Sequence, residues 1–261
     1  MRGQSLLAAL LLAVTGLGGS CEGPSSEEII LRRVARDLSK SPEQLTSKDL
    51  ASVGKLDLSH TGVSDLGCLL RMPNLQQLEL FETPVSDISP LARLERLEVL
   101  GLAATKVSDL TPLRGLRQLR VLDISFTPVS DLSPLSELTG LTGLALVRTR
   151  VCDLSPLSNM NNLTGLDLLD TPVSDLTPLS GLTALESLHL SGTHVSDLAP
   201  LRSIPQLRLL YLERTPVRDL SPLQNVPTLE EIWLTHSQAA SLNPTKVLPQ
   251  LRKVHVDDIR P

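Results

Sequence analysis

One short stretch of sequence decides the fold, because it recurs along the chain with small changes. Residues 119–135 read LRVLDISFTPVSDLSPL and contain Thr127. The same position returns every 22 residues, and its occupants are Thr61, Thr83, Thr105, Thr127, Thr149, Thr171, Thr193 and Thr215, with Ser237 in the ninth place. Self-similarity at a fixed period of this kind indicates stacked supersecondary units. The sequence therefore predicts a solenoid.

Each repeat contains the pattern of one strand and one turn. The Leu-x-Leu segment, as in residues 78–80 or 166–168, alternates apolar and polar residues, which is typical of a strand with one buried face. A Ser/Thr-Pro-Leu step follows, as in Ser133-Pro134-Leu135, and we expect its hydroxyl to cap a short turn that starts at the proline. The predicted fold class is an α/β solenoid with a parallel concave β-sheet and short helical or 3-10 turns on the convex side.

The repeat over residues 119–129, with leucine, leucine, isoleucine, threonine and valine at fixed positions, resembles that of the leucine-rich repeat family and especially its bacterial internalin-type version. The resemblance covers residues 26–261. That family usually has asparagine where this chain has threonine, so we expect different contacts at the strand end. The resemblance implies an exported binding module that recognises a protein partner, with no enzymatic activity and no cofactor.

The first residues have the pattern of an export signal. Arg2 is followed by an apolar run over residues 6–14 and by the small residues 18–20, and the run is too short to span a bilayer. We predict a signal peptide over residues 1–20 and a tether over residues 21–25. Cys21 stands where a bacterial lipoprotein carries its lipidated cysteine, so a lipid anchor in the cell envelope and free secretion are both open.

A helical cap is expected over residues 26–53, before the repeats of residues 54–261, because a solenoid must shield its first apolar layer. Ile29, Ile30, Val34 and Leu38 follow helical spacing, and residues 46–49 (Thr-Ser-Lys-Asp) can open a second short helix as a capping box. No separate cap is evident in the sequence at the carboxy-terminal end, where Ser241 replaces the aspartate of the other repeats.

Charge and cysteine content exclude two classes of interaction. The formal net charge is −5 and the sequence has no basic stripe, which argues against a nucleic-acid partner. We expect the protein to contact a membrane only through Cys21. Cys68 and Cys152 lie four repeats apart, roughly 19 Å at strand spacing, whereas a disulfide needs Cα atoms within about 7 Å. We expect both thiols to be free and the chain to be a monomer.

An aspartate recurs four residues after each threonine, in a column formed by Asp65, Asp87, Asp109, Asp131, Asp153, Asp175, Asp197 and Asp219. We expect each carboxylate to accept a backbone N–H just downstream. The alternative is calcium shared between repeats, but six to eight oxygens are needed and each repeat offers a single acid. The sequence therefore favours no metal.

The positions that face outward on the strands vary, and all four aromatic residues lie there. We call one column on four successive strands the ring ladder; it consists of His189, Tyr211, Trp233 and His255. Arg214 and His236 flank it, Phe126, Arg148 and Asp170 form a second row, and Phe81 lies nearer the amino terminus. Adjacent tyrosine and tryptophan rings favour a ligand-binding surface.

The opposite half of the same face is acidic, through Asp57, Glu79, Glu82 and Asp123. A partner is therefore expected to place apolar groups on the ring ladder and positive groups on the acidic half. Asp167, His189 and Ser191 have the residue types of a catalytic triad, but an open strand face offers no enclosed pocket or evident oxyanion hole, so we predict no catalysis.

Three functions remain open from sequence alone. The first is an exported protein-recognition module, which the repeat and the mixed face favour. The second is a glycan- or wall-binding protein in which the rings stack on sugars. The third is an intracellular regulator that resembles phosphatase-regulating proteins with similar 22-residue repeats, and the predicted export signal argues against it.

Overall fold

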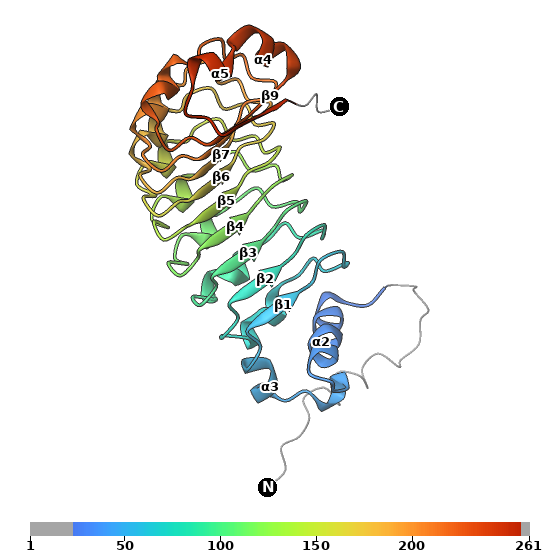
Figure 1. Ribbon diagram of the computed structural model, residues 1–261. Helices are drawn as coiled ribbons and strands as arrows, with labels where there is room; N and C mark the ends of the chain where they lie inside the picture. Colours follow the sequence, from blue (N-terminus) through green and yellow to red (C-terminus); the bar gives the residue numbers. More distant parts are fainter. Residues whose placement is uncertain (1–22, 257–261) are drawn as a thin grey trace.

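Ten short parallel strands form a single sheet in chain order, which confirms the predicted solenoid of parallel strands and short turns (Figure 1). The computed structural model describes residues 23–256. The strands are β1 (Lys55–Asp57), β2 (Gln77–Glu79), β3 (Val99–Gly101), β4 (Val121–Asp123), β5 (Gly143–Ala145), β6 (Gly165–Asp167), β7 (Ser187–His189), β8 (Leu209–Tyr211), β9 (Glu231–Leu234) and β10 (Lys253–Val256). Each strand residue pairs with the residue 22 positions later in the next strand, as Leu122 does with Leu144.

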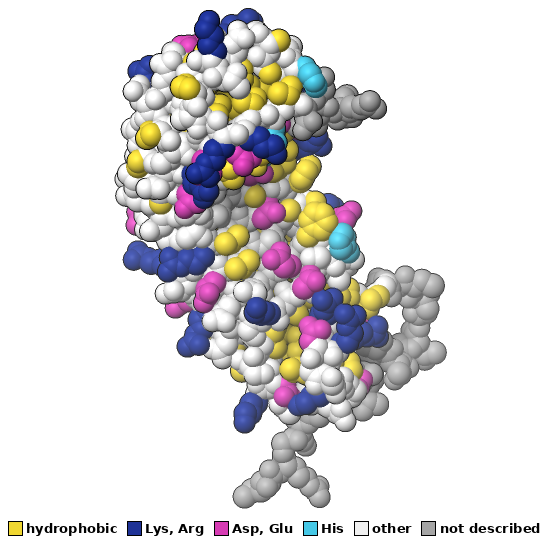
Figure 2. Space-filling view, viewed as in Figure 1, with side chains coloured by type: hydrophobic (Ala, Val, Ile, Leu, Met, Phe, Trp, Pro, Cys, Tyr) yellow, Lys and Arg dark blue, Asp and Glu magenta, His cyan; other side chains and the backbone are white. Residues whose placement is uncertain are grey.

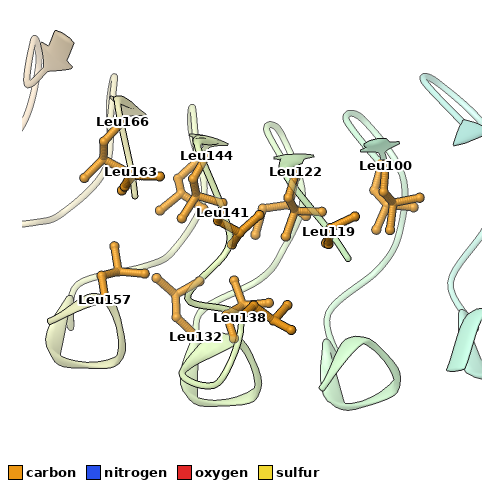
Figure 3. Packing of buried hydrophobic residues seen from close by; sticks show 14 of the residues in the cluster. Leu100, Leu119, Leu122, Leu132, Leu138, Leu141, Leu144, Leu157, Leu163 and Leu166 are labelled. Atoms are coloured by element: carbon orange, nitrogen blue, oxygen red, sulfur yellow. The ribbon is translucent and has the colours of Figure 1, made fainter. Parts of the chain in front are cut away.

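The convex side is built from 3-10 helices, one per repeat. They span Gly67–Arg71, Ser89–Arg93, Thr111–Leu113, Ser133–Leu135, Ser155–Leu157, Thr177–Gly181, Ala199–Ser203 and Ser221–Asn225. The leucine at their third position and the apolar residues three and six positions later point back to the strands, and Leu91, Leu94 and Leu97 are at most 1% exposed. Figure 3 shows these layers, with Leu122, Leu144 and Leu166 under neighbouring strands and Leu132 and Leu157 rising from the turns.

The helix caps differ from one expectation. Six of these eight 3-10 helices start at the serine or threonine itself. A leucine or isoleucine occupies the cap position without a side-chain hydrogen bond, so the prediction of a hydroxyl cap is wrong. The aspartate two residues earlier takes that role. All eight carboxylates of the aspartate column accept the backbone N–H two residues downstream at 2.8 Å, as predicted.

The recurring threonines stabilise each repeat from within. Each of the eight hydroxyls donates to the carbonyl oxygen three residues earlier, at 2.5–2.8 Å, as Thr127 does to Ile124. Seven of the eight threonines are buried. The threonine thus closes the turn of its own repeat, and the Thr215 hydroxyl also accepts a hydrogen bond from the Gln238 amide of the next coil at 3.3 Å.

The amino-terminal cap is helical, as expected, but its buried face is different. Helix α2 (Ser26–Asp37) buries Ile30, Leu31, Val34 and Ala35, whereas Leu38 lies outside the helix and is exposed. A 3-10 turn (Pro42–Gln44) leads to α3 (Ser47–Ala51), whose capping box between Thr46 and Asp49 confirms the predicted one. The Ser26 hydroxyl accepts the backbone N–H groups of residues 64 and 65, which attaches α2 to the first repeat.

The last described coil replaces its 3-10 turn with two α-helices, α4 (His236–Leu242) and α5 (Pro244–Val247), which the sequence did not predict. Thr235 and Gln238 form a capping box at the start of α4. The Gln238 amide also donates to the carbonyl oxygens of Leu212 and Thr215, at 2.9 and 3.1 Å, and so ties α4 to the preceding coil. Ser237 therefore lies in a helix and does not close a turn as the threonines do.

Several predictions fall on other parts of the chain. The predicted signal peptide, Cys21 and the end of the last repeat lie outside the described residues, whereas no described helix has the length and apolar character needed to cross a membrane. Cys68 and Cys152 are free thiols, as predicted. Burial raises the pKa of Cys68 to about 11, so this thiol is a packing residue at neutral pH.

Candidate binding surface

The ring ladder is a continuous stack. His189 and Tyr211 have ring centroids 4.6 Å apart, Tyr211 and Trp233 stack at 3.9 Å, and Trp233 and His255 stack at 4.1 Å with planes 3° apart. The cause is the parallel register, since it places these four residues opposite one another on β7 to β10. The sequence correctly places the four rings in one column.

Stacking changes what the ring ladder can offer to a ligand. All four side chains are partly buried, and both faces of the Tyr211 and Trp233 rings are covered by their neighbours. Ring edges, the tyrosine hydroxyl and the indole N–H are the groups left for contact. Burial and then the charge of Glu213 raise the pKa of Tyr211, so its hydroxyl stays protonated and can donate a hydrogen bond.

Acidic partners hold the two terminal histidines of the ladder. His255 Nε2 lies 2.6 Å from Glu231 Oε2, and His189 Nδ1 lies 3.2 Å from Asp167 Oδ1. His189 Nε2 is buried and has no hydrogen-bond partner among the described residues. The carboxylates fix the two imidazoles, and one buried ring nitrogen of the ladder remains unpaired.

The column of residues that follow β1 to β8 by three positions has a left-handed backbone, which was not predicted. Positive φ angles of 53–59° occur at His60, Glu82, Ala104, Phe126, Arg148, Asp170 and Arg214, and Gly192 has a φ of 71°. The chain turns sharply here, so these side chains project from the edge of the strand face. His236, which flanks the ring ladder in sequence, begins α4 and leaves this column.

The second row forms an ion-pair cluster around Asp170. Arg148 Nε lies 3.0 Å from one oxygen of the Asp170 carboxylate, and Arg214 Nη2 lies 2.9 Å from the other. Gly192, between them in the column, makes this possible, because a Cβ there would lie 2.1 Å from Asp170 Oδ1. The Arg148 guanidinium also lies over the Phe126 ring, 5.6 Å from its centroid.

Two phenylalanines are exposed at the edge of the face. Phe126 is 50% exposed and Phe81 is 39% exposed. The imidazole of His60 meets the Phe81 ring edge-on at 5.0 Å and lies 2.8 Å from Glu82. Both rings are separate from the ring ladder, which lies on β7–β10, so the predicted site residues form two distinct groups.

The acidic half is only partly neutralised. Arg33 of α2 lies 3.2 Å from Asp57, and His60 pairs with Glu82. Glu79 and Asp123 have no cationic partner within residues 23–256, and the Glu79 carboxylate lies over Gly101. Burial raises the pKa of Glu79, and the charges of Asp57 and Asp123 add to the shift. In the view of Figure 2, acidic and apolar side chains are mixed over the middle of the molecule.

A groove lies over β4 to β8, along a column that the sequence reasoning missed. Its volume is about 440 Å³, and its floor contains Val121, Gly143, Gly165 and Ser187. Asp123, Ala145, Asp167, His189 and Tyr211 also line it, so the ring ladder reaches its end. The available signal was the pair of glycines at strand positions, since glycine within a strand often marks close approach of a ligand.

Comparison with known proteins agrees with this architecture. A family model described as leucine-rich repeats (2 copies) matches residues 183–225. An internalin structure from Listeria monocytogenes is 29% identical with a TM-score of 0.76, and the alignment covers 92% of this chain and 75% of that chain. Internalin C2 from the same organism is 26% identical with a TM-score of 0.76, over 92% of this chain and 100% of the other. The chain is a leucine-rich repeat solenoid similar to internalins.

More distant likeness extends the fold comparison. A leucine-rich repeat protein from Leptospira interrogans shares the fold at a TM-score of 0.67 with 17% identity, over 81% of this chain and 62% of that chain. Comparison with curated proteins gave no significant match. Leucine-rich repeat solenoids commonly serve as protein-interaction modules with extended concave surfaces, and the concave face of this internalin-like protein carries the groups described above.

The residues considered for catalysis are not arranged as a triad in this internalin-like protein. His189 contacts Asp167, but the Ser191 hydroxyl donates to Glu213, and both Ser191 and Glu213 are buried, at 0% and 3% exposure. Ser191 was expected to lie on the open strand face, and that expectation is wrong. Ser191 is therefore closed to a substrate.

The aspartate column has no geometry for a metal in the part of the chain that the structure describes. No group of three or more His, Cys, Asp or Glu side chains there could hold a metal ion. One oxygen of each column carboxylate is already used by a backbone N–H group. The aspartate column therefore stabilises the convex turns.

Proposed function

We propose that this internalin-like protein is an exported, non-catalytic recognition module that binds a protein partner on its concave face. The observation that carries the proposal is the continuous ring ladder, which shares one open surface with carboxylates that have no cationic partner among the described residues. Tyrosine and tryptophan contribute large contact area at low entropic cost. The partner would place apolar or aromatic groups against the ring edges and positive groups near Glu79 and Asp123.

The ring geometry also bears on glycan binding, the alternative function. Sugars bind aromatic side chains through the ring face, but both faces of Tyr211 and Trp233 are already covered. The ladder therefore favours a protein surface, which can contact ring edges, a hydroxyl and an indole N–H. If the chain is not retained on polysaccharide or peptidoglycan, the result fits a protein partner. If it is retained, and Tyr211→Ala abolishes the retention, the result favours a glycan ligand instead.

Affinity capture tests the proposed partner class. The chain without residues 1–20 would be immobilised beside a Tyr211→Ala/Trp233→Ala double variant, and we expect a protein ligand to be lost from the variant. Leu70→Ala is the matched control, because Leu70 is 45% exposed on the convex side. Equal capture by the wild-type protein and the ring variant would contradict the use of the ring ladder.

Export rests on residues 1–21, whose pattern predicts a cleaved signal and places Cys21 at the cleavage site. We propose that the mature chain lies in the bacterial cell envelope through a lipid on Cys21 or is secreted. Detergent partitioning distinguishes these outcomes, since a lipidated chain moves to the detergent phase and Cys21→Ser returns it to water. A full-length, uncleaved chain in the cytosol would instead support the intracellular regulator.

A further inference from the structure

The groove over β4–β8 exists because two strand positions lack side chains. A Cβ at Gly165 would meet nothing within 4 Å, and one at Gly143 would only touch Val121 at 3.8 Å. Neither residue has the positive φ that requires glycine. Glycine weakens a strand, so the stability of the fold does not explain the presence of these two glycines. What they supply is open space above the sheet.

The groove is apolar along its floor and acidic at its edge. Asp123 and Asp167 border it on either side of Ala145, about 9.6 Å apart by two strand spacings. Asp123 uses Oδ1 to accept the Ser125 N–H, which leaves its second oxygen available. Among the described residues no cation pairs with Asp123, and His189 is the partner of Asp167.

The nearby groups increase the need for a cation. Burial and the charges of Asp57 and Asp123 raise the pKa of Glu79, which shows that negative charge is crowded along this strip. His189 contacts Asp167 through Nδ1, which favours the proton on that nitrogen and leaves Nε2 as a buried acceptor without a partner. A positively charged hydrogen-bond donor would complement the carboxylates, whereas His189 Nε2 is closed to a ligand by its burial.

We propose that the groove binds an arginine side chain of the partner, which deepens the proposed function and rests on it. The aliphatic part of arginine would lie on Gly143, Ala145 and Gly165, as long basic side chains commonly cover apolar surface. The planar guanidinium has five N–H donors, so it can serve the carboxylates of Asp123 and Asp167 across the width of the groove. A lysine ammonium is a compact charge and spans this gap less well.

Peptide titration followed by amide resonances tests the ligand chemistry. The folded chain, isotope-labelled, is titrated with capped Gly-Arg-Gly and with the same peptide carrying citrulline, the neutral isostere of arginine. We expect resonance shifts at Gly143 and Gly165 for the arginine peptide and at least about tenfold weaker affinity in Asp123→Asn, because the guanidinium loses its charged hydrogen-bond acceptor. Equal shifts with the citrulline peptide, or no shifts with either peptide, overturn the proposal. Stronger binding of the corresponding lysine peptide overturns the choice of arginine.

A second variant fills the groove without disturbing the sheet. Gly165→Val places a side chain where nothing lies within 4 Å, and Gly115→Val is the control, since Gly115 also meets nothing within 4 Å and lies outside the groove. We expect the first variant to lose arginine-peptide binding and the control to keep it, with both melting near the wild-type temperature. Arginine-peptide binding retained by Gly165→Val contradicts the groove.

The same variants separate this inference from the proposed function. If Tyr211→Ala/Trp233→Ala abolishes partner capture and Gly165→Val leaves both capture and peptide binding intact, concave recognition stands and the arginine site is wrong. If Gly165→Val abolishes peptide binding while the ring variant still captures the partner, the arginine site stands and docking on the ring ladder is wrong.

Discussion

At the scale of single residues, the structure depends on one hydroxyl per repeat. The recurring threonine donates to the carbonyl oxygen three residues earlier, and seven of these threonines are buried. A buried carbonyl without a partner costs free energy, since it loses its hydrogen bonds to water. This explains why a polar residue occupies a fixed position next to a leucine core.

Thr127→Val is expected to lower the free energy of unfolding by about 1 kcal/mol, because valine keeps the shape and removes the donor to Ile124. Urea denaturation measures this difference. Thr183→Val is the matched control, since Thr183 is exposed, and its effect is expected to stay within about 0.5 kcal/mol. Equal losses in the two variants would show that the buried hydrogen bond contributes nothing.

Several residue-scale features could be anticipated from sequence and several could not. The period alone aligned His189, Tyr211, Trp233 and His255, because parallel pairing in register follows from equal repeat length. It could not show that the rings cover one another. Alternation also could not reveal the burial of Ser191 and Glu213, because the exposure of that position differs between repeats that share the same backbone turn.

At the scale of elements, each convex turn is fixed by a carboxylate and by apolar packing. The aspartate column was readable because an acid two residues before a 3-10 helix has an obvious backbone donor. The buried face of α2 was less readable, since Ile29 to Leu31 are all apolar and a one-residue rotation exchanges Ile29 and Leu38 for Leu31 and Ala35. The α-helices α4 and α5 were missed because the repeat pattern was extended through Ser237.

Asp131→Ala is expected to lower the melting temperature at pH 7 by about 2 °C, since the first N–H group of a 3-10 helix loses its acceptor. Hydrogen bonds from the Ser133 backbone and side chain lower the pKa of Asp131 below its ordinary 3.8. The stabilisation is therefore present above pH 3.8 and is lost as the pH falls through the lowered pKa. Melting curves across this range should converge for the wild-type protein and the variant at the acidic end.

Asp131→Asn is the control for charge, because its amide oxygen still accepts the Ser133 N–H and does not titrate in this range. Its difference from the wild-type protein should also shrink toward low pH, while its own melting temperature should vary less with pH. A gap between the wild-type protein and Asp131→Ala that stays constant down to pH 2 would show that the carboxylate charge is not the source of the stabilisation.

At the scale of the whole molecule, the solenoid is a one-dimensional stack in which each coil contacts its neighbours (Figure 1). Stability in such a stack is approximately a sum of repeat terms and nearest-neighbour terms. The ends are therefore the weakest places, and α2 covers the first coil with Ile30, Leu31 and Val34. The ring ladder stands on the last four strands, far along the stack from α2.

Ile30→Ala is expected to lower the free energy of unfolding by about 2–4 kcal/mol, because Ile30 is fully buried in α2 and its truncation leaves a cavity. Leu38→Ala is the control, since Leu38 is 37% exposed and its removal opens no cavity. Hydrogen exchange in native buffer should show which backbone amides lose protection. Because coupling passes between neighbouring coils, amides of β1 and β2 should lose the most protection and those of β8 and β9 the least. A uniform loss from β1 to β9 would mean that the stack opens as one unit, and then a change in the cap would also alter binding at the distant ring ladder.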